Sequence, residues 1–230
     1  MKNATNTNTK IYLAVAFILS IISFINFVIF IKAVSGLKPW SDVESFMQTV
    51  NTPVYMYLQM DYFFGLLSVD FFGILAVCLH EYAAENKKIL SRISMMFANS
   101  FLVTACIYYS TQLFSINENI SIGQTNGLEM FIAINPTSFS YTLALLSWSI
   151  LFPLSLISAA FIFQGTILKL ATKTMLLLSG ALLLFSAIFH ALNAINVSAL
   201  TNILGLFLSM PVSIILITLV FWKDNSNLNP

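Results

Sequence analysis

Six long runs of apolar residues, separated by shorter polar stretches, dominate this chain of 230 residues. A helix that crosses a lipid bilayer needs about 20 mostly apolar residues, and each run reaches that length. The pattern predicts an all-α fold, a bundle of six transmembrane helices over residues 11–31, 53–82, 93–115, 139–163, 175–195 and 200–222. We expect one membrane domain over residues 11–222, between a disordered cytoplasmic tail at 1–10 and a short cytoplasmic tail at 223–230.

The lysine and arginine residues gather on one side of this predicted bundle. If the amino terminus is inside, the outer loops hold only Lys32 and Lys38 of the ten basic residues. The other eight lie inside: Lys2, Lys10, Lys87, Lys88, Arg92, Lys169, Lys173 and Lys223. Basic residues accumulate in cytoplasmic loops. We therefore expect an N-in, C-in, multi-pass protein of the cytoplasmic (cell) membrane.

Composition argues against several classes of function. Charged residues make up 8% of the chain, against about 25% in soluble domains, so we expect the lipid bilayer as a partner and no nucleic acid. The two cysteines, Cys78 and Cys106, lie in apolar runs without CxxC spacing, which argues against a disulfide scaffold, a zinc site or a thiol redox motif. The chain has no P-loop, GxGxxG or GxSxG motif, and we expect no cofactor.

The two longest loops, about residues 32–52 and 117–137, are both predicted to lie outside. In the first loop, Ser41 followed by Glu44 is a capping-box pattern, and apolar residues at helical spacing come after it. We expect a short amphipathic helix on the outer surface there. Long loops often carry function, which favours a site on the outer side. The alternative is that these loops only cover the bundle.

Asp70 lies near the middle of the second predicted helix, where an acid is costly. Insertion scales put that cost at roughly 2.5–3.5 kcal/mol, so such residues usually face the bundle interior and mark functional sites. The helical period places Gln59, Asp70 and Gly73 on one narrow face. The alternative is a carboxyl group that only forms an interhelical hydrogen bond.

Other polar residues fall toward the outer ends of the third and fifth predicted helices. Tyr108 and Gln112 lie along one face of the third helix, and Asn193 follows His190 on nearly one face of the fifth. An interfacial tyrosine anchor and an interfacial hydrogen-bonded histidine are the alternatives. If these faces converge, they form an outward-facing, ligand-binding polar pocket of Gln59, Asp70, Tyr108, Gln112, His190 and Asn193.

Three further polar features have simpler interpretations. Residues 80–85, HEYAAE, invite comparison with the HExxH motif of zinc proteases, but Glu85 replaces the second histidine. A solvated helix end is therefore favoured there, and we expect no metal site. Asn26 and Gln164 are isolated polar residues that we expect to form interhelical hydrogen bonds.

Prolines interrupt the fourth and sixth predicted helices at Pro153 and Pro211. A proline inside a helix removes one hydrogen bond and usually kinks the helix. The neighbouring Ser149 and Ser209 are placed to satisfy the freed backbone groups. Such kinks can form pockets, or they can serve only to shape the helix.

The segment from Tyr109 to Leu146 resembles a pattern in uncharacterised prokaryotic multi-span membrane proteins. In that pattern, a Gln-bearing helix end is followed by a Gly-Leu-Glu loop, an Asn-Pro pair and a Phe-rich helix. The matching residues here are Gln112, Gly127, Leu128, Glu129, Asn135, Pro136 and Phe139. The resemblance implies a prokaryotic six-span membrane protein and transfers no site residue.

Three functions are compatible with these features. The leading hypothesis is a binding or transport module for a small-molecule or lipophilic ligand that enters from the outer side. The second is a membrane enzyme in which Asp70 or His190 acts as a general acid or base on a lipid-like substrate. It lacks a recognisable nucleophile or metal set, so we assign no catalytic residue. The third is an interaction or sensory subunit that meets a membrane-protein partner through its outer loops.

Overall fold

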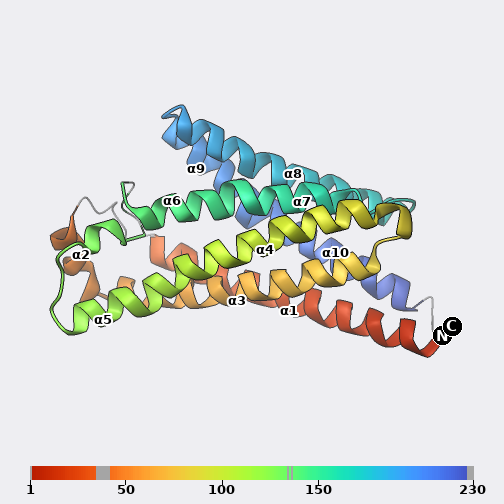
Figure 1. Ribbon diagram of the computed structural model, residues 1–230, viewed down its shortest axis with the longest axis horizontal. Coiled ribbons are helices and arrows are strands. Elements are labelled where there is room, and N and C mark those ends of the chain that lie inside the picture. The colour runs from red at the N-terminus through yellow and green to blue at the C-terminus, as the bar shows by residue number, and fades with distance from the viewer. Residues whose placement is uncertain (1, 35–41, 134, 136, 227–230) are drawn as a thin grey trace.

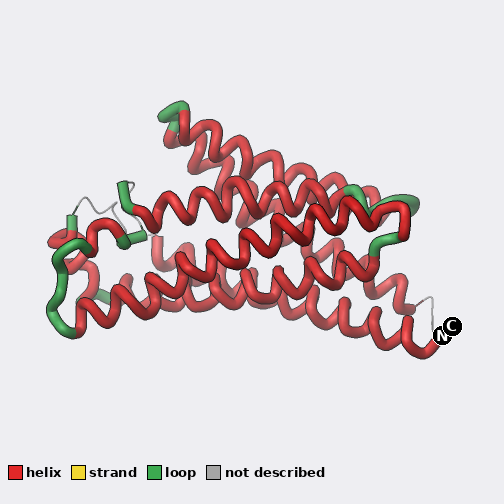
Figure 2. Tube along the Cα trace, in the orientation of Figure 1, coloured by secondary structure: helices red, strands yellow, loops and turns green. Residues whose placement is uncertain are grey.

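The computed structural model describes residues 2–34, 42–133, 135 and 137–226, and the described chain contains helices and no strands (Figures 1 and 2). Six helical segments are long and apolar enough to cross a membrane. They are Thr9–Ala33, Pro53–Tyr82, Glu85–Ser121, Phe139–Ala160, Ile167–Ala191 and Ile195–Ser226. The all-α fold and the six apolar spans predicted from the hydrophobic pattern are therefore confirmed.

Two helices begin before the apolar runs that predict them. Helix α1 (Lys2–Val34) begins within the polar amino-terminal stretch that we expected to be disordered, and α8 (Ile167–Ala191) begins eight residues before the predicted start. Neither polar extension contains a proline or glycine, the residues that most strongly interrupt helices. Apolar length therefore predicts the presence of a helix better than its ends.

Helix α3 (Pro53–Tyr82) has the predicted bounds and the most buried span of the bundle. Pro53 occupies its first turn, where a missing N–H costs nothing. It packs against α1 on one side and against α4 (Lys88–Ser110) on the other. Helix α3 thereby connects the amino-terminal helix to the rest of the bundle.

Three of the six segments contain a π-helical turn within the described residues. Turn η2 (Thr111–Ser115) joins α4 to α5 (Ile116–Ser121). Turn η4 (Ser147–Leu151) joins α6 (Phe139–Leu146) to α7 (Phe152–Ala160), and turn η5 (Leu204–Ser209) joins α9 (Ile195–Ile203) to α10 (Met210–Ser226). π-Turns inside α-helices are rare and are often found at functional sites.

Two of the π-turns lie directly before the two mid-helix prolines. A proline cannot donate to the backbone ladder and its ring collides with the preceding turn, so a widened turn accommodates it. Ser209, two residues before Pro211, donates its hydroxyl to the carbonyl oxygens of Leu204 at 3.1 Å and Gly205 at 3.0 Å. The Ser209 hydroxyl therefore bonds carbonyls within the π-turn, and not the carbonyl of Phe207, four residues before Pro211, that the proline leaves without its usual donor.

Pairs of buried serines hold neighbouring helices together. Ser94 on α4 and Ser155 on α7 each donate a hydroxyl to the other's carbonyl oxygen, at 2.9 and 3.0 Å. Ser186 on α8 and Ser198 on α9 repeat this arrangement at 3.0 and 2.8 Å. Small residues let helix backbones approach closely in a membrane, where hydrogen bonds then act between them.

The two ends of the bundle differ (Figure 1). At the terminal end, where the chain begins and ends, α1 packs against α10, and α10 against α8. At the opposite end, the loop end, lie α2 (Val43–Val50) and the tip of the α8–α9 hairpin, where His190 meets Tyr141 of α6.

The short helix expected in the first long loop is present as α2. Its cap is Asp42, whose carboxylate accepts a hydrogen bond from the backbone N–H of Ser45 at 2.7 Å. Phe46 is buried and its ring meets that of Tyr55 on α3 edge to face, with centroids 5.9 Å apart. The predicted amphipathic helix is confirmed, whereas the predicted capping residue Ser41 lies outside the described residues.

Polar side chains also tie the helices together at the terminal end. The hydroxyl of Tyr82 on α3 donates to Asp224 on α10 at 2.7 Å, and the ammonium of Lys169 on α8 pairs with the same carboxylate at 3.0 Å. His80, the first residue of the HEYAAE segment, instead bonds Ser91 on α4, at 2.8 Å. Within the described residues, no group of three His, Cys, Asp or Glu side chains could hold a metal ion.

Candidate functional site

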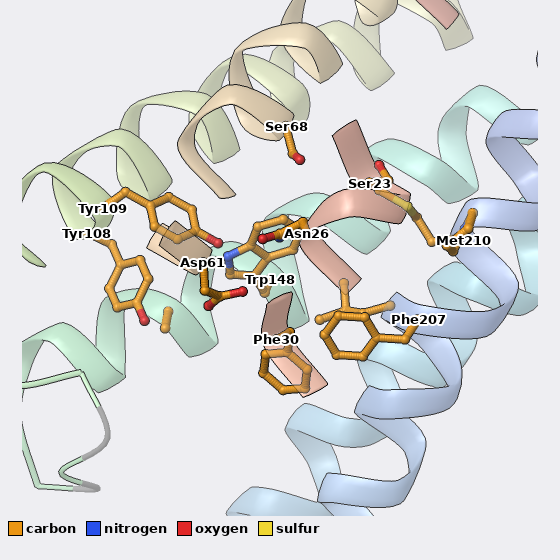
Figure 3. A pocket seen from close by; sticks show the side chains of 13 residues that line it. Ser23, Asn26, Phe30, Asp61, Ser68, Tyr108, Tyr109, Trp148, Phe207 and Met210 are labelled. Atoms are coloured by element: carbon orange, nitrogen blue, oxygen red, sulfur yellow. The ribbon is translucent and has the colours of Figure 1, made fainter. Parts of the chain in front are cut away.

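A chamber of about 180 Å³ lies between α1, α3, α4 and the two proline-associated π-turns (Figure 3). Polar and aromatic side chains make up much of its wall, although it lies among helices that are otherwise apolar. Its lining consists of Ser23, Asn26, Phe30, Asp61, Ser68, Tyr108, Tyr109, Ala144, Trp148, Leu206, Phe207, Met210 and Pro211. The chamber is only partly enclosed, so it is a site that a ligand could enter.

A hydrogen-bonded pair, Asn26 on α1 and Asp61 on α3, forms the most polar part of the chamber. With its nitrogen toward Asp61, the Asn26 amide donates to the carboxylate oxygen Oδ1 at 3.0 Å and to the Asp61 backbone carbonyl at 3.2 Å. Asp61 is eight residues beyond Pro53, about 12 Å along the helix axis. The interhelical hydrogen bond expected of Asn26 is therefore confirmed, and its partner is an acid.

Tyr109 reaches the chamber because α3 has a glycine beneath it. A Cβ atom on Gly65 would lie only 2.5 Å from Cζ of Tyr109 and 2.7 Å from its hydroxyl oxygen. The tyrosine ring therefore lies directly on the backbone of α3. In Figure 3 its hydroxyl points toward the indole nitrogen of Trp148 and lies on the same side of the chamber as Asp61. Gly65 thus sets the depth at which Tyr109 packs.

Trp148 belongs to the π-turn η4 and is fixed by rings below it. Its indole meets the ring of Phe101 at a centroid distance of 4.8 Å and that of Phe152 at 5.3 Å. The preceding Ser147 donates its hydroxyl to Thr104 on α4 at 2.8 Å. The indole is therefore a rigid part of the chamber wall.

Aromatic rings also close the chamber between α1 and the second π-turn, η5. The ring of Phe207 stacks on that of Phe30 at a centroid distance of 4.4 Å and meets Phe27 at 5.4 Å. Near this contact, the hydroxyl of Ser23 is buried and has no hydrogen-bond partner within the described residues. Both π-turns therefore contribute an aromatic side chain to the chamber, and one buried polar group there is unsatisfied.

Asp70 is not part of this chamber. Its side chain is exposed on the outside of the bundle, where Oδ1 accepts a weak contact from the thiol of Cys106 at 3.7 Å. The expectation that Asp70 faces the interior is therefore wrong. Asp61 and Asp70 are nine residues apart, which places them about 180° apart around a helix. Because Asp61 faces the chamber, Asp70 must face away from it.

The two glutamines of the predicted pocket lie in separate networks near the loop end. The carbonyl oxygen of Gln59 accepts from the amide of Asn117 on α5 at 2.9 Å, and the Tyr55 hydroxyl donates to the same Asn117. Gln112 is buried on η2, where its nitrogen donates to the carbonyl of Phe131 at 2.7 Å and its oxygen accepts from the N–H of Ala133 at 3.2 Å. Gln59 therefore ties α3 to α5, and Gln112 anchors the second long loop.

His190 and Asn193 lie at the tip of the α8–α9 hairpin. The ring of His190 faces Tyr141 on α6 with centroids 5.5 Å apart. Asn193 adopts a left-handed conformation, with φ of 58°, and the N–H of Ala194 bonds the carbonyl of Phe189 at 2.8 Å. This is the Schellman arrangement that ends a helix. Of the six predicted residues, only Tyr108 lines the chamber.

Asn26 and Asp61 were not predicted to line a pocket, although the sequence contains a signal for Asn26. Asn26 is the only amide within the first apolar run, and a buried amide in a membrane needs a partner on another helix. Asp61 lies eight residues beyond Pro53, toward the predicted outer end of its run, whereas Asp70 lies near the centre. Gln164, the other isolated amide, lies exposed between α7 and α8 and not within a helix.

Comparison with protein-family models, with curated proteins and with solved structures finds no match to this chain. The fold itself defines the class: an all-α chain with six helices able to cross a membrane. The chamber then provides functional groups that a ligand could contact. It offers a carboxylate, an amide, hydroxyl groups and five aromatic rings within one partly enclosed space.

Proposed function

We propose that the protein is a binding and transport module of the cytoplasmic membrane, with its amino and carboxyl termini inside. The loop end then faces outward, because the basic residues concentrate at the terminal end. A small or lipophilic molecule occupies the chamber at Asn26 and Asp61. Entry is from the loop end or from the surrounding lipid.

The observation that supports this proposal is a partly enclosed chamber lined by polar and aromatic side chains among six apolar helices. A helix of 30 residues is about 45 Å long, whereas the hydrocarbon layer is about 30 Å thick. If the bilayer is centred on α3, Asp61 lies about 5 Å inside the hydrocarbon boundary. Ionisable groups at such depth are costly and usually serve ligand or ion pathways.

The two alternative functions have less support. The acid–base enzyme relied on Asp70 and His190, but Asp70 is exposed on α3 and His190 packs against Tyr141. An interaction subunit would rely on its outer loops, and Gln112 fixes the second of these to the bundle. Neither function accounts for the chamber.

A substitution that fills the chamber tests the proposal. Purified protein is screened by thermal unfolding against a panel of small neutral and charged lipophilic compounds. A compound present at about 100 times its Kd stabilises the folded state by about 2.7 kcal/mol. We expect such compounds to stabilise the wild type and not the Ala144→Phe variant, because Ala144 lines the chamber.

The matched control is Ala191→Phe, at an exposed alanine beside the hairpin tip, which should retain every wild-type response. Binding that persists unchanged in Ala144→Phe would refute the proposal. So would a panel in which no compound stabilises the wild type.

A further inference from the structure

We propose that the chamber is selective for a compact organic cation, a quaternary or protonated amine, whose charge pairs with the carboxylate of Asp61. This inference rests on the proposed binding function and specifies its ligand class. The inference follows from the carboxylate of Asp61, from the aromatic side chains that line the chamber and from the volume of the chamber.

The charge of Asp61 has no counterpart in the described chain. Its carboxylate accepts a hydrogen bond from the neutral amide of Asn26, and it pairs with no lysine, arginine or histidine among the described residues. An ion pair of the bundle, Lys169 with Asp224, is at the terminal end. A carboxylate removed from water must be neutralised by a proton or by a cation. A bound cation would provide that charge.

Aromatic rings surround the same space. Tyr108, Tyr109 and Trp148 contribute to the wall near Asp61, and Phe30 and Phe207 contribute to the wall between α1 and η5. The faces of aromatic rings attract cations within about 6 Å, and such rings recognise quaternary ammonium groups in particular. Neutral apolar ligands do not require the carboxylate, and anions would be repelled by it.

The volume limits the ligand to a small one. A protein cavity of about 150 Å³ accommodates benzene. The present chamber, at about 180 Å³, is only slightly larger, so it suits a trimethylammonium group with a short polar arm. The unpartnered hydroxyl of Ser23 is available to such an arm.

The test uses two molecules of nearly the same shape. Choline carries a trimethylammonium group, and 3,3-dimethylbutan-1-ol replaces its nitrogen with carbon and is neutral. Binding of each is measured by calorimetry to the wild type, Asp61→Asn and Asp70→Asn. An uncharged maltoside detergent is used because it contains no ammonium group. Asp70→Asn is the matched control, since it makes the same change on the opposite face of the same helix.

We expect the wild type and Asp70→Asn to bind choline at least about tenfold more tightly than the neutral alcohol. Asp61→Asn should lose that preference. If Asp61→Asn does not fold, two results test the inference: whether the wild type prefers choline to the neutral alcohol, and whether Ala144→Phe abolishes that preference.

Equal affinity for the two molecules would overturn the inference, because a protonated Asp61 would account for it. A choline preference that survives in Asp61→Asn would also overturn it, as would the absence of choline binding. In each of these cases the binding function still stands if other compounds are excluded by Ala144→Phe. The proposed binding function itself fails if Ala144→Phe excludes no compound.

Discussion

Replacing Gly65 with alanine tests the packing that shapes the chamber. The added Cβ would lie 2.5 and 2.6 Å from two carbon atoms of the Tyr109 ring. The ring is nearly buried and is bordered by the rings of Tyr108, at 4.8 Å, and Tyr62, at 6.4 Å, so it has little room to move. Overpacking of this kind costs about 1–3 kcal/mol.

A second, opposing contribution to stability makes the sign of the measured stability change informative. Alanine is favoured over glycine inside a helix by about 1 kcal/mol. Without the collision, Gly65→Ala would therefore stabilise the protein. With it, the net change is between about zero and 2 kcal/mol of destabilisation. The free energy of unfolding is measured in mixed micelles with increasing denaturing detergent.

A double-mutant cycle with Tyr109→Ala isolates the collision. In that background the ring is absent, so Gly65→Ala should stabilise the protein by about 1 kcal/mol. The control Gly73→Ala meets only the flexible end of Leu102, at 3.3 Å, and should be close to neutral or stabilising. The reasoning is refuted if Gly65→Ala has the same effect with and without the Tyr109 ring.

Three other substitutions give smaller, distinct effects. Ser94→Ala removes one hydroxyl of a buried reciprocal pair and should destabilise the protein by about 1 kcal/mol in the same unfolding assay. Gln112→Leu removes both bonds to the second long loop, and limited proteolysis should then cleave that loop faster while the melting temperature of the bundle changes little. Asp224→Asn weakens the ion pair with Lys169, which is partly exposed, and should cost less than about 1 kcal/mol.

Each effect has a comparison that can contradict it. The Ser94→Ala, Ser155→Ala double variant should lose about twice as much as the single one, because each hydroxyl donates to a backbone carbonyl that alanine leaves in place. Loop cleavage that is unchanged in Gln112→Leu would show that other contacts hold the loop. A loss in Asp224→Asn larger than that in Ser94→Ala would show that the terminal end contributes more than surface electrostatics allows.

Polar contacts and one glycine hold the second long loop in place. Gln112 binds the backbone at Phe131 and Ala133, and the amide of Asn135 donates to the carbonyl of Glu129 at 2.9 Å. Gly127 has a positive φ of 82°, a conformation that suits glycine. These contacts give the segment a structural role at the loop end of the bundle.

The sequence alone determined the six helices, because the apolar length needed to cross a membrane is a local property of each run. It also indicated α2 and the interhelical bond of Asn26. The helical period further requires Asp61 and Asp70 to lie on opposite faces of α3.

Only the tertiary structure decided which of these two acids faces the interior. The rotation of α3 about its own axis depends on its neighbours, and the packing of Tyr109 on Gly65 together with the Asn26 bond turns Asp61 inward. No periodic pattern within α3 contains that information, because it is mostly apolar on all faces. The chamber therefore follows from contacts between helices and not from the sequence of any one of them.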